Sequence, residues 1–169
     1  MKTKHLLLFC MLLSSIGFIS CKKNSTNTSN LQVKLTDSPV GYDEVNVDIL
    51  EVKVNFRDDS TGWVSLTTNA KVYNLLALQN GVEALLASGT VQTGTVKEIR
   101  LILGNNNTIM DRGVSYPLTI PSGSESGLKI KVGKSLNATL ENLVIDFDTA
   151  LSISQESTGY KLRPVLKIR

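Results

Sequence analysis

Short runs in which apolar and polar residues alternate recur between residue 31 and residue 169 of this chain. Leu31, Val33 and Leu35 form the first of these runs, and turn residues separate the later ones at intervals of about a dozen residues. A period of two places one set of side chains on the core face of a β-strand and the other on its solvent face. The alternation predicts an all-β fold, an antiparallel β-sandwich of about eight or nine short strands with one minor helix.

The strand predicted over residues 142–148 combines the strongest core signal with a candidate site. Leu143, Ile145 and Phe147 fall on one face, which we expect to lie in the middle of the core. Asp146 and Asp148 fall on the other face, one strand repeat apart, which is roughly 7 Å at about 3.3 Å per residue.

Two further features set the expected course of the first strands. The apolar phase slips by one residue at Ile49-Leu50, and a β-bulge or a break explains the slip because it keeps the core face continuous. Residues 58–62, Asp-Asp-Ser-Thr-Gly, form a predicted hairpin loop, and Trp63 begins the return strand.

Helix formers and prolines set expectations for the rest of the chain. Residues 82–87 are good helix formers, so we expect the minor helix there, with about two turns. Pro117 indicates an edge strand, because proline has no N–H to donate to a neighbouring strand. Pro164 indicates the same for the closing strand, predicted over residues 160–169.

The first residues of the chain have the composition of an export signal. Residues 1–20 contain a basic start and a short apolar run, a secretory signal peptide too short to span a membrane. Cys21 follows Phe18-Ile19-Ser20, a sequence typical of a bacterial lipobox, so we expect it to be lipidated; an ordinary cleaved signal with an incidental cysteine is the alternative. Residues 21–30 then form the lipidated cysteine and a polar tether, and residues 31–169 a single domain.

The mature chain lacks several side chains that catalysis often requires. The two cysteines of the full sequence are Cys10, in the signal, and Cys21, and its one histidine is His5, also in the signal. The domain therefore has no Cys or His zinc site, no Cys–His nucleophile and no Ser–His–Asp triad. The 18 Lys and Arg side chains fall to 16 without Lys2 and Lys4, against 15 carboxylates, so charge gives no support to nucleic-acid binding.

Three aspartates are the weak candidates for a metal site. Asp146 and Asp148, with Asp37, could contribute to a Ca²⁺ site, although no Asp-x-Asp-x-Asp-Gly loop is present. Asp146 with a second carboxylate could also serve glycan hydrolysis. The alternative is a polar strand face paired with Arg163, Arg100 or a lysine, and for Asp37 a turn-forming role.

Other polar and aromatic residues suggest weaker sites. Residues 121–127 superficially resemble a phosphate cradle but lack the Gly-Lys-Ser/Thr ending, which indicates a mobile surface loop. Ser60 and Thr149 lie in Asp-Ser/Thr-small triplets, a pattern that some envelope bacteria O-glycosylate, and Ser60 is the better acceptor because it lies in a predicted loop. The aromatic residues could stack on a sugar or simply pack in the core; they are Trp63, Tyr73, Tyr116 and Tyr160.

Five short signatures occur in a fixed order along the mature chain. They are Leu35-Thr36-Asp37-Ser38-Pro39, Tyr42-Asp43-Glu44-Val45, Pro121-Ser122-Gly123 with Gly127-Leu128-Lys129, Asp146-Phe147-Asp148, and Tyr160-Lys161-Leu162-Arg163-Pro164. In this order they resemble an uncharacterised family of bacterial and archaeal envelope lipoprotein domains, a domain of unknown function. The resemblance covers about residues 31–169 and implies an exported β-rich domain. It implies no catalytic residue.

These observations favour a non-catalytic module of the cell envelope, lipid-anchored to the outer membrane. We expect it to bind a glycan or a protein partner, or to serve a structural role, without a cofactor and without nucleic acid. The alternatives are a carboxylate-dependent glycan hydrolase and a Ca²⁺-stabilised adhesin.

Overall fold

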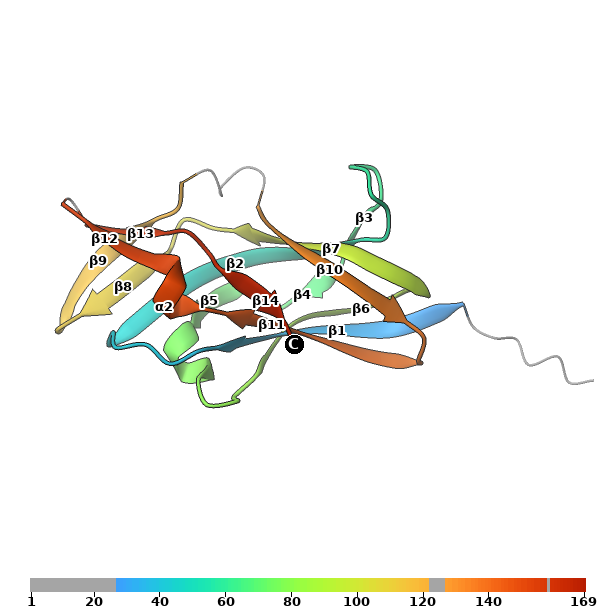
Figure 1. Cartoon of the computed structure of the whole chain (residues 1–169), viewed down its shortest axis with the longest axis horizontal. Coiled ribbons are helices and arrows are strands. Elements are labelled where there is room, and N and C mark those ends of the chain that lie inside the picture. The colour runs from blue at the N-terminus through green and yellow to red at the C-terminus, as the bar shows by residue number, and fades with distance from the viewer. Residues whose placement is uncertain (1–26, 122–126, 158) are drawn as a thin grey trace, which may run out of the picture.

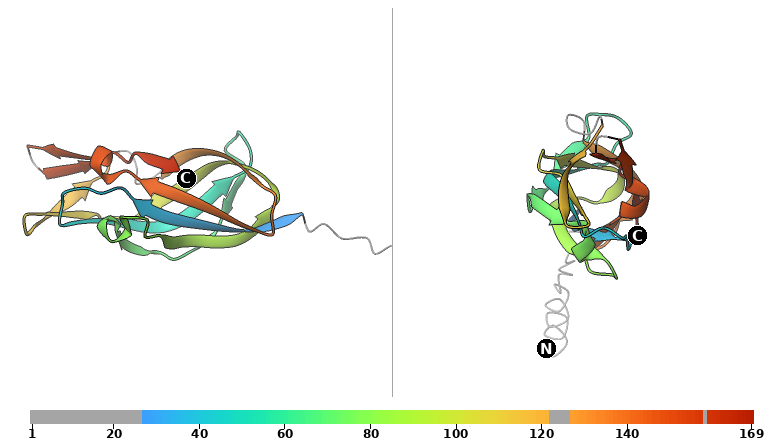
Figure 2. Two further views of the ribbon diagram at one scale, coloured as in Figure 1. Left: turned by 60° about the horizontal axis from the view of Figure 1, so that its bottom comes forward. Right: turned by 90° about the vertical axis from the view of Figure 1, so that its left-hand side faces the viewer.

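A computed structural model of the chain describes residues 27–121, 127–157 and 159–169. Two β-sheets pack against each other along the length of an elongated domain (Figures 1 and 2). The sheets do not close into a barrel, and the all-β sandwich predicted from the alternation is confirmed. The sheets are mixed and not purely antiparallel as predicted, because two of the strand pairs run parallel. None of the described helices is long and apolar enough to cross a membrane.

The smaller sheet has five strands and contains the first strand of the domain. Its order is β14 (Leu166–Ile168), β11 (Leu140–Phe147), β1 (Thr28–Asp37), β6 (Ala84–Gln92) and β4 (Thr67–Thr68). β1 pairs in parallel with β11 and antiparallel with β6, so it lies in the middle of the sheet. A central strand is covered on both edges, which suits its continuous row of core side chains.

The larger sheet has nine strands built around the long strand β2 (Glu44–Asn55). β7 (Gly94–Leu103) and β10 (Leu128–Leu136) follow on one side, and β3 (Trp63–Ser65) and β5 (Lys71–Asn74) also pair with β2. On the other side the order is β8 (Thr108–Asp111), β9 (Val114–Thr119), β13 (Gly159–Leu162) and β12 (Ile153–Glu156). The described residues thus form fourteen strands rather than eight or nine, because several pairings last only two to four residues.

The core lies between the two sheets and contains the face predicted for residues 142–148. Leu143, Ile145 and Phe147 are at most 1% exposed, as predicted. The bulge predicted at Ile49-Leu50 is also confirmed, because the β2–β7 register shifts there and Ile49 is 1% exposed while Leu50 is 49% exposed. The shift keeps Val52 and Val54 on the core side of β2.

The helix predicted over residues 82–87 is wrong. From Ala84 onward this segment belongs to β6, where Leu86 is buried and Leu85 is 40% exposed. A helix of two turns is marginal alone, whereas pairing along β1 satisfies the backbone over nine residues. The helices of the described chain are a 3₁₀ turn, η1 (Leu75–Leu78), and one turn of α-helix, α2 (Thr149–Ser152).

The strand predicted over residues 160–169 is broken in two. β13 belongs to the larger sheet and β14 to the smaller one, and Pro164 lies in the crossing between them. β14 is an edge strand, as predicted, but β9 around Pro117 is not, because it lies between β8 and β13. Within β9 only Leu118 and Thr119 pair with β13, so the missing N–H of Pro117 costs no hydrogen bond in that pairing.

The domain begins earlier than the predicted tether allows. β1 starts at Thr28, and Ser29 is 1% exposed, although residues 28–30 contain no apolar side chain. Backbone pairing explains the difference, since the Asn30 N–H donates to the Thr139 carbonyl oxygen at 2.8 Å. The predicted signal peptide and Cys21 lie outside the described residues, as do residues 122–126 of the predicted loop.

Candidate functional site

Two of the five signatures lie side by side although more than a hundred residues separate them in sequence. The parallel pairing of β1 and β11 places Leu35 opposite Ile145 and Asp37 opposite Phe147. The Tyr42 ring of a third signature packs edge-on against Tyr160 of a fourth, with 6.0 Å between ring centres. The signatures therefore link distant strands of the sandwich.

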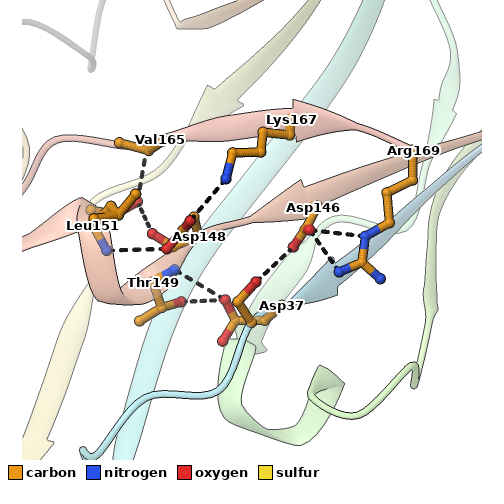
Figure 3. Close-up of polar contacts among 10 residues, drawn as sticks. Asp37, Asp146, Asp148, Thr149, Leu151, Val165, Lys167 and Arg169 are labelled. Atoms are coloured by element: carbon orange, nitrogen blue, oxygen red, sulfur yellow. Dashed lines mark hydrogen bonds and ion pairs between the residues drawn. The ribbon is translucent and has the colours of Figure 1, made fainter.

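Asp37 is buried at the end of β1 and holds the start of α2. Its Oδ1 accepts hydrogen bonds from the Thr149 backbone N–H at 3.1 Å and from Thr149 Oγ1 at 2.6 Å (Figure 3). Burial raises the pKa of Asp37, and the hydrogen bonds from Thr149 oppose part of this effect. The turn-forming role predicted for Asp37 is wrong, because its carboxylate bridges two segments instead of capping its own turn.

Asp146 lies nearby on β11, and its side chain is largely buried. Its Oδ2 is 2.8 Å from the Arg169 guanidinium, and its Oδ1 accepts a long hydrogen bond of 3.4 Å from Ser38 Oγ. Arg163 and Arg100, named as partners from the sequence, make no ion pair with either aspartate in the described residues. Arg163 lies in the crossing between β13 and β14, and the alternation does not predict the break that places it there.

Asp148 is not on the strand but is the residue that caps α2. Its Oδ1 accepts from the Leu151 backbone N–H at 3.2 Å, which satisfies a free donor of the first turn. Its Oδ2 is 3.2 Å from Lys167 Nζ, in agreement with the predicted lysine partner. The expected pair of carboxylates on one strand face is therefore wrong, because the strand ends at Phe147.

The three aspartates point to three different partners, as Figure 3 shows. Asp37 accepts hydrogen bonds from Thr149, and Asp146 forms an ion pair with Arg169. Asp148 caps the α2 turn and forms an ion pair with Lys167. In the part of the chain that the structure describes, no three His, Cys, Asp or Glu side chains are grouped so that they could hold a metal ion. This arrangement stabilises the junction of β1, β11, α2 and β14.

The two predicted O-glycosylation residues differ in access. Thr149 is 0% exposed and its hydroxyl donates to Asp37, so the folded domain offers no acceptor there. Ser60 is exposed in the loop between β2 and β3, as predicted. Its neighbour Thr61 donates its hydroxyl to Asp59 Oδ1 at 2.7 Å.

The predicted aromatic platform is divided between three places. Tyr73 is 4% exposed in the core. Tyr116 and Tyr160 pack together at 5.3 Å between ring centres, near β8 and β9. The Tyr160 hydroxyl donates a hydrogen bond to Asp111. This hydrogen bond and burial raise the pKa of Tyr160 to about 12, so the side chain is packed and neutral. Trp63 lines a groove at the opposite end of β2.

A groove of about 720 Å³ lies between the β2–β3 hairpin and the β6–β7 turn. The turn contributes residues 90–95, which carry three threonines, one glutamine, one valine and one glycine. The hairpin contributes two aromatic rings, one cation and smaller groups; they are Phe56, Arg57, Thr61, Gly62, Trp63 and Val64. The lining thus combines aromatic faces with neutral hydrogen-bonding side chains and one charge.

Asn55 and Gly62 fix the shape of the hairpin that lines the groove. Asn55 is 0% exposed; its Nδ2 donates to the Asp59 carbonyl oxygen at 2.6 Å, and its Oδ1 accepts from the Arg57 N–H at 2.9 Å. A Cβ at Gly62 would lie 2.3 Å from Asn55 Oδ1, so a larger residue would displace the loop. These contacts hold Arg57 and Trp63 at the groove wall.

One face of the Trp63 indole is covered by a cation. The Arg100 guanidinium lies over the ring, 4.1 Å from its centre, in a cation–π contact. A ring that is already fixed loses little conformational freedom when a ligand stacks on it, which favours binding. Sequence reasoning identified Trp63 but not Phe56, Arg57 or residues 90–95, because only the fold brings the β6–β7 turn to the hairpin.

The comparisons with known proteins give a family but no activity. A family model described as "Domain of unknown function (DUF4382)" matches residues 28–164. The match starts at the first residue of β1 and covers all of the strands except β14. Neither a curated protein nor a solved structure matches the chain.

Proposed function

We propose a function for this chain, which belongs to the DUF4382 family. It is a lipid-anchored module of the cell envelope, located at the outer membrane. It binds a glycan and does not catalyse a reaction on it. The groove beside Trp63 is the binding site in this proposal. Cys21 supplies the anchor.

The composition of the groove is the observation that carries the proposal. Sugars offer apolar C–H faces and many hydroxyl groups, and aromatic rings beside hydroxyl and amide side chains complement both. Phe56 and Trp63 supply the rings, and Thr90, Gln92 and Thr95 belong to the opposite wall. A few polar groups in a cleft with apolar walls are typical of small-ligand sites.

Two observations favour binding over catalysis. Residues 22–169 contain no histidine and no cysteine, so an acid or base at this site would have to be a carboxylate, a lysine or a tyrosine, and the described lining contains no lysine or tyrosine. The described residues that line the groove include no carboxylate, and Asp58 and Asp59 of the neighbouring loop point to Lys97 and Thr61.

Calorimetric titration with a panel of neutral and acidic oligosaccharides tests the proposal. We expect at least one class to bind with a dissociation constant in the micromolar to millimolar range, and Trp63→Leu to abolish the heat. Tyr42→Leu is the matched control, because it removes an aromatic ring at the far end of the domain. Binding by neither class, or equal loss in both variants, would contradict the proposal.

Two further measurements test the alternatives, a glycan hydrolase and a Ca²⁺-stabilised adhesin. The first uses the same mixtures of protein and oligosaccharide. Product analysis after long incubation detects cleavage, which would favour the hydrolase and which should disappear in Asp146→Asn if that carboxylate acts. Melting with and without Ca²⁺ detects the adhesin, since a ligand at a hundred times its Kd stabilises a domain by about 2.7 kcal/mol. We expect no cleavage and no Ca²⁺-dependent shift.

A further inference from the structure

The groove lies at the end of the domain where the chain runs back toward Cys21. Thr28 and Ser29, the first residues of β1, pair with Gln92 and Val91 of the groove wall. The Thr93 N–H donates to the Asn27 carbonyl oxygen at 2.9 Å. Figure 1 shows β1 leading out at the same end as the β6–β7 turn and the β2–β3 hairpin.

The length of chain before β1 limits how far the groove can lie from the membrane. Six peptide steps separate Cys21 from Asn27, and six steps span at most about 20 Å when fully extended. The tyrosine cluster, formed by Tyr42, Tyr116 and Tyr160, lies near the opposite end of β2, where Glu44 pairs with Met110 of β8. The eleven steps from Glu44 to Asn55 add roughly 36 Å. A lipid on Cys21 would therefore keep the groove end of the domain within about 20 Å of the headgroups, closer than any other end of the chain is required to be.

Arg57 gives the groove a preference for an anionic ligand. It is exposed and is the one charged side chain in the described lining. No carboxylate of the described residues lies within ion-pair distance of it, although its charge helps to lower the pKa of Asp59 after the larger effect of the Thr61 hydrogen bonds. A guanidinium at a groove wall suits a phosphate or a carboxylate, to which it can donate two parallel hydrogen bonds.

We infer that the ligand is the anionic saccharide headgroup of a glycolipid in the membrane that anchors the protein. This inference rests on the proposed function and adds the source and charge of the glycan. One sugar face stacks on Trp63, while Arg57 takes the phosphate or carboxylate of the headgroup. The lipid anchor and the groove then hold the same membrane at two points, and the short tether raises the effective concentration of the headgroup.

Fluorescence of the full mature, lipidated protein in vesicles tests the inference, because Trp63 is the one tryptophan of the chain. Three phosphatidylcholine vesicles are compared: one with a phosphorylated glycolipid, one with a neutral glycolipid and one with phosphatidylglycerol at matched charge. We expect a saturable Trp63 emission shift only with the phosphorylated glycolipid. Arg57→Gln should raise the glycolipid content needed for half of that shift about tenfold, as expected for one lost charged hydrogen bond.

The control variant is Arg112→Gln, which removes an exposed cation from the turn between β8 and β9. It should leave the shift unchanged. An equal shift with the neutral glycolipid overturns the anionic assignment, and an equal shift with phosphatidylglycerol overturns recognition of the sugar. If no vesicle gives a shift but soluble oligosaccharides do, the membrane source is wrong and the proposed function stands. If soluble oligosaccharides also fail to bind, the proposed function fails with it.

Discussion

Thr149→Val isolates the hydrogen bond by which the buried Asp37 holds α2. Valine has nearly the shape of threonine, so the change removes the Oγ1 donor at 2.6 Å and leaves the backbone donor at 3.1 Å. A hydrogen bond to a charged group contributes about 1.5–3 kcal/mol, and we expect a loss of that size in the free energy of unfolding. For a domain of this size each kcal/mol lowers the Tm by about 3–6 °C.

Asp37→Asn separates the charge from the hydrogen bonds. The amide oxygen still accepts from Thr149, and the variant carries no buried charge, so we expect stability within about 1 kcal/mol of the parent at neutral pH. In this background Thr149→Val should cost only about 1 kcal/mol, as for a neutral hydrogen bond. Urea unfolding of the four proteins gives the coupling between the two residues.

The pH dependence of the same proteins gives an independent check. Burial raises the folded-state pKa of Asp37, so the folded domain holds this proton more tightly than the unfolded chain does. The contribution of Asp37 is therefore fully present below the unfolded pKa and is lost as the pH rises through the folded pKa. Stability of the parent relative to Asp37→Asn should fall with rising pH in that window. A rise would contradict the raised pKa of Asp37, because it would mean that the hydrogen bonds to the carboxylate outweigh burial. A Thr149→Val cost below about 0.5 kcal/mol would refute the bridging role.

Three further predictions address the core, the ion pair and the anchor. Phe147→Ala should cost about 3–5 kcal/mol in urea unfolding, because the ring is 1% exposed between the sheets, and a loss below about 1 kcal/mol would contradict that packing. Arg169→Gln should cost about 1–2 kcal/mol at low salt, because it leaves the carboxylate of Asp146 largely buried without its cation; no loss would show that water replaces the guanidinium. Cys21→Ala should move the protein from the detergent phase to the aqueous phase or leave it unprocessed, and unchanged partitioning after signal removal would rule out the anchor.

The core of the fold could be predicted because it depends on local alternation. Leu31, Val33 and Leu35 read as a core row from the sequence alone, and each is 0% exposed. The bulge at Ile49-Leu50 was predictable for the same reason, since a slip of one residue is visible wherever one face must stay apolar.

The errors share a physical cause, which is that pairing with a distant strand outweighs local preference. Residues 84–87 favour a helix locally, but the free edge of β1 takes them into β6. Asp148 read as the next position of a strand, although an aspartate before Thr149 and Ala150 is also a helix N-cap signal, and this second interpretation is correct.

The candidate site was only partly predictable. Trp63 stood out because it is a single tryptophan beside a predicted loop, but the sequence does not show what faces it. The β6–β7 turn reaches the hairpin because β6 and β7 lie in different sheets, so their connection crosses the end of the sandwich. That neighbour relation depends on sheet order, which alternation does not encode.

Amide and side-chain NMR shifts during titration with the best-binding oligosaccharide test the central claim, that the groove beside Trp63 is the binding site. We expect saturable shifts confined to residues 56–64 and 90–95, with the Trp63 indole N–H among the largest. Tyr116 and Thr149, at the tyrosine cluster and the aspartate junction, should not move. Saturable shifts centred on either of those places, with the groove silent, would contradict the account.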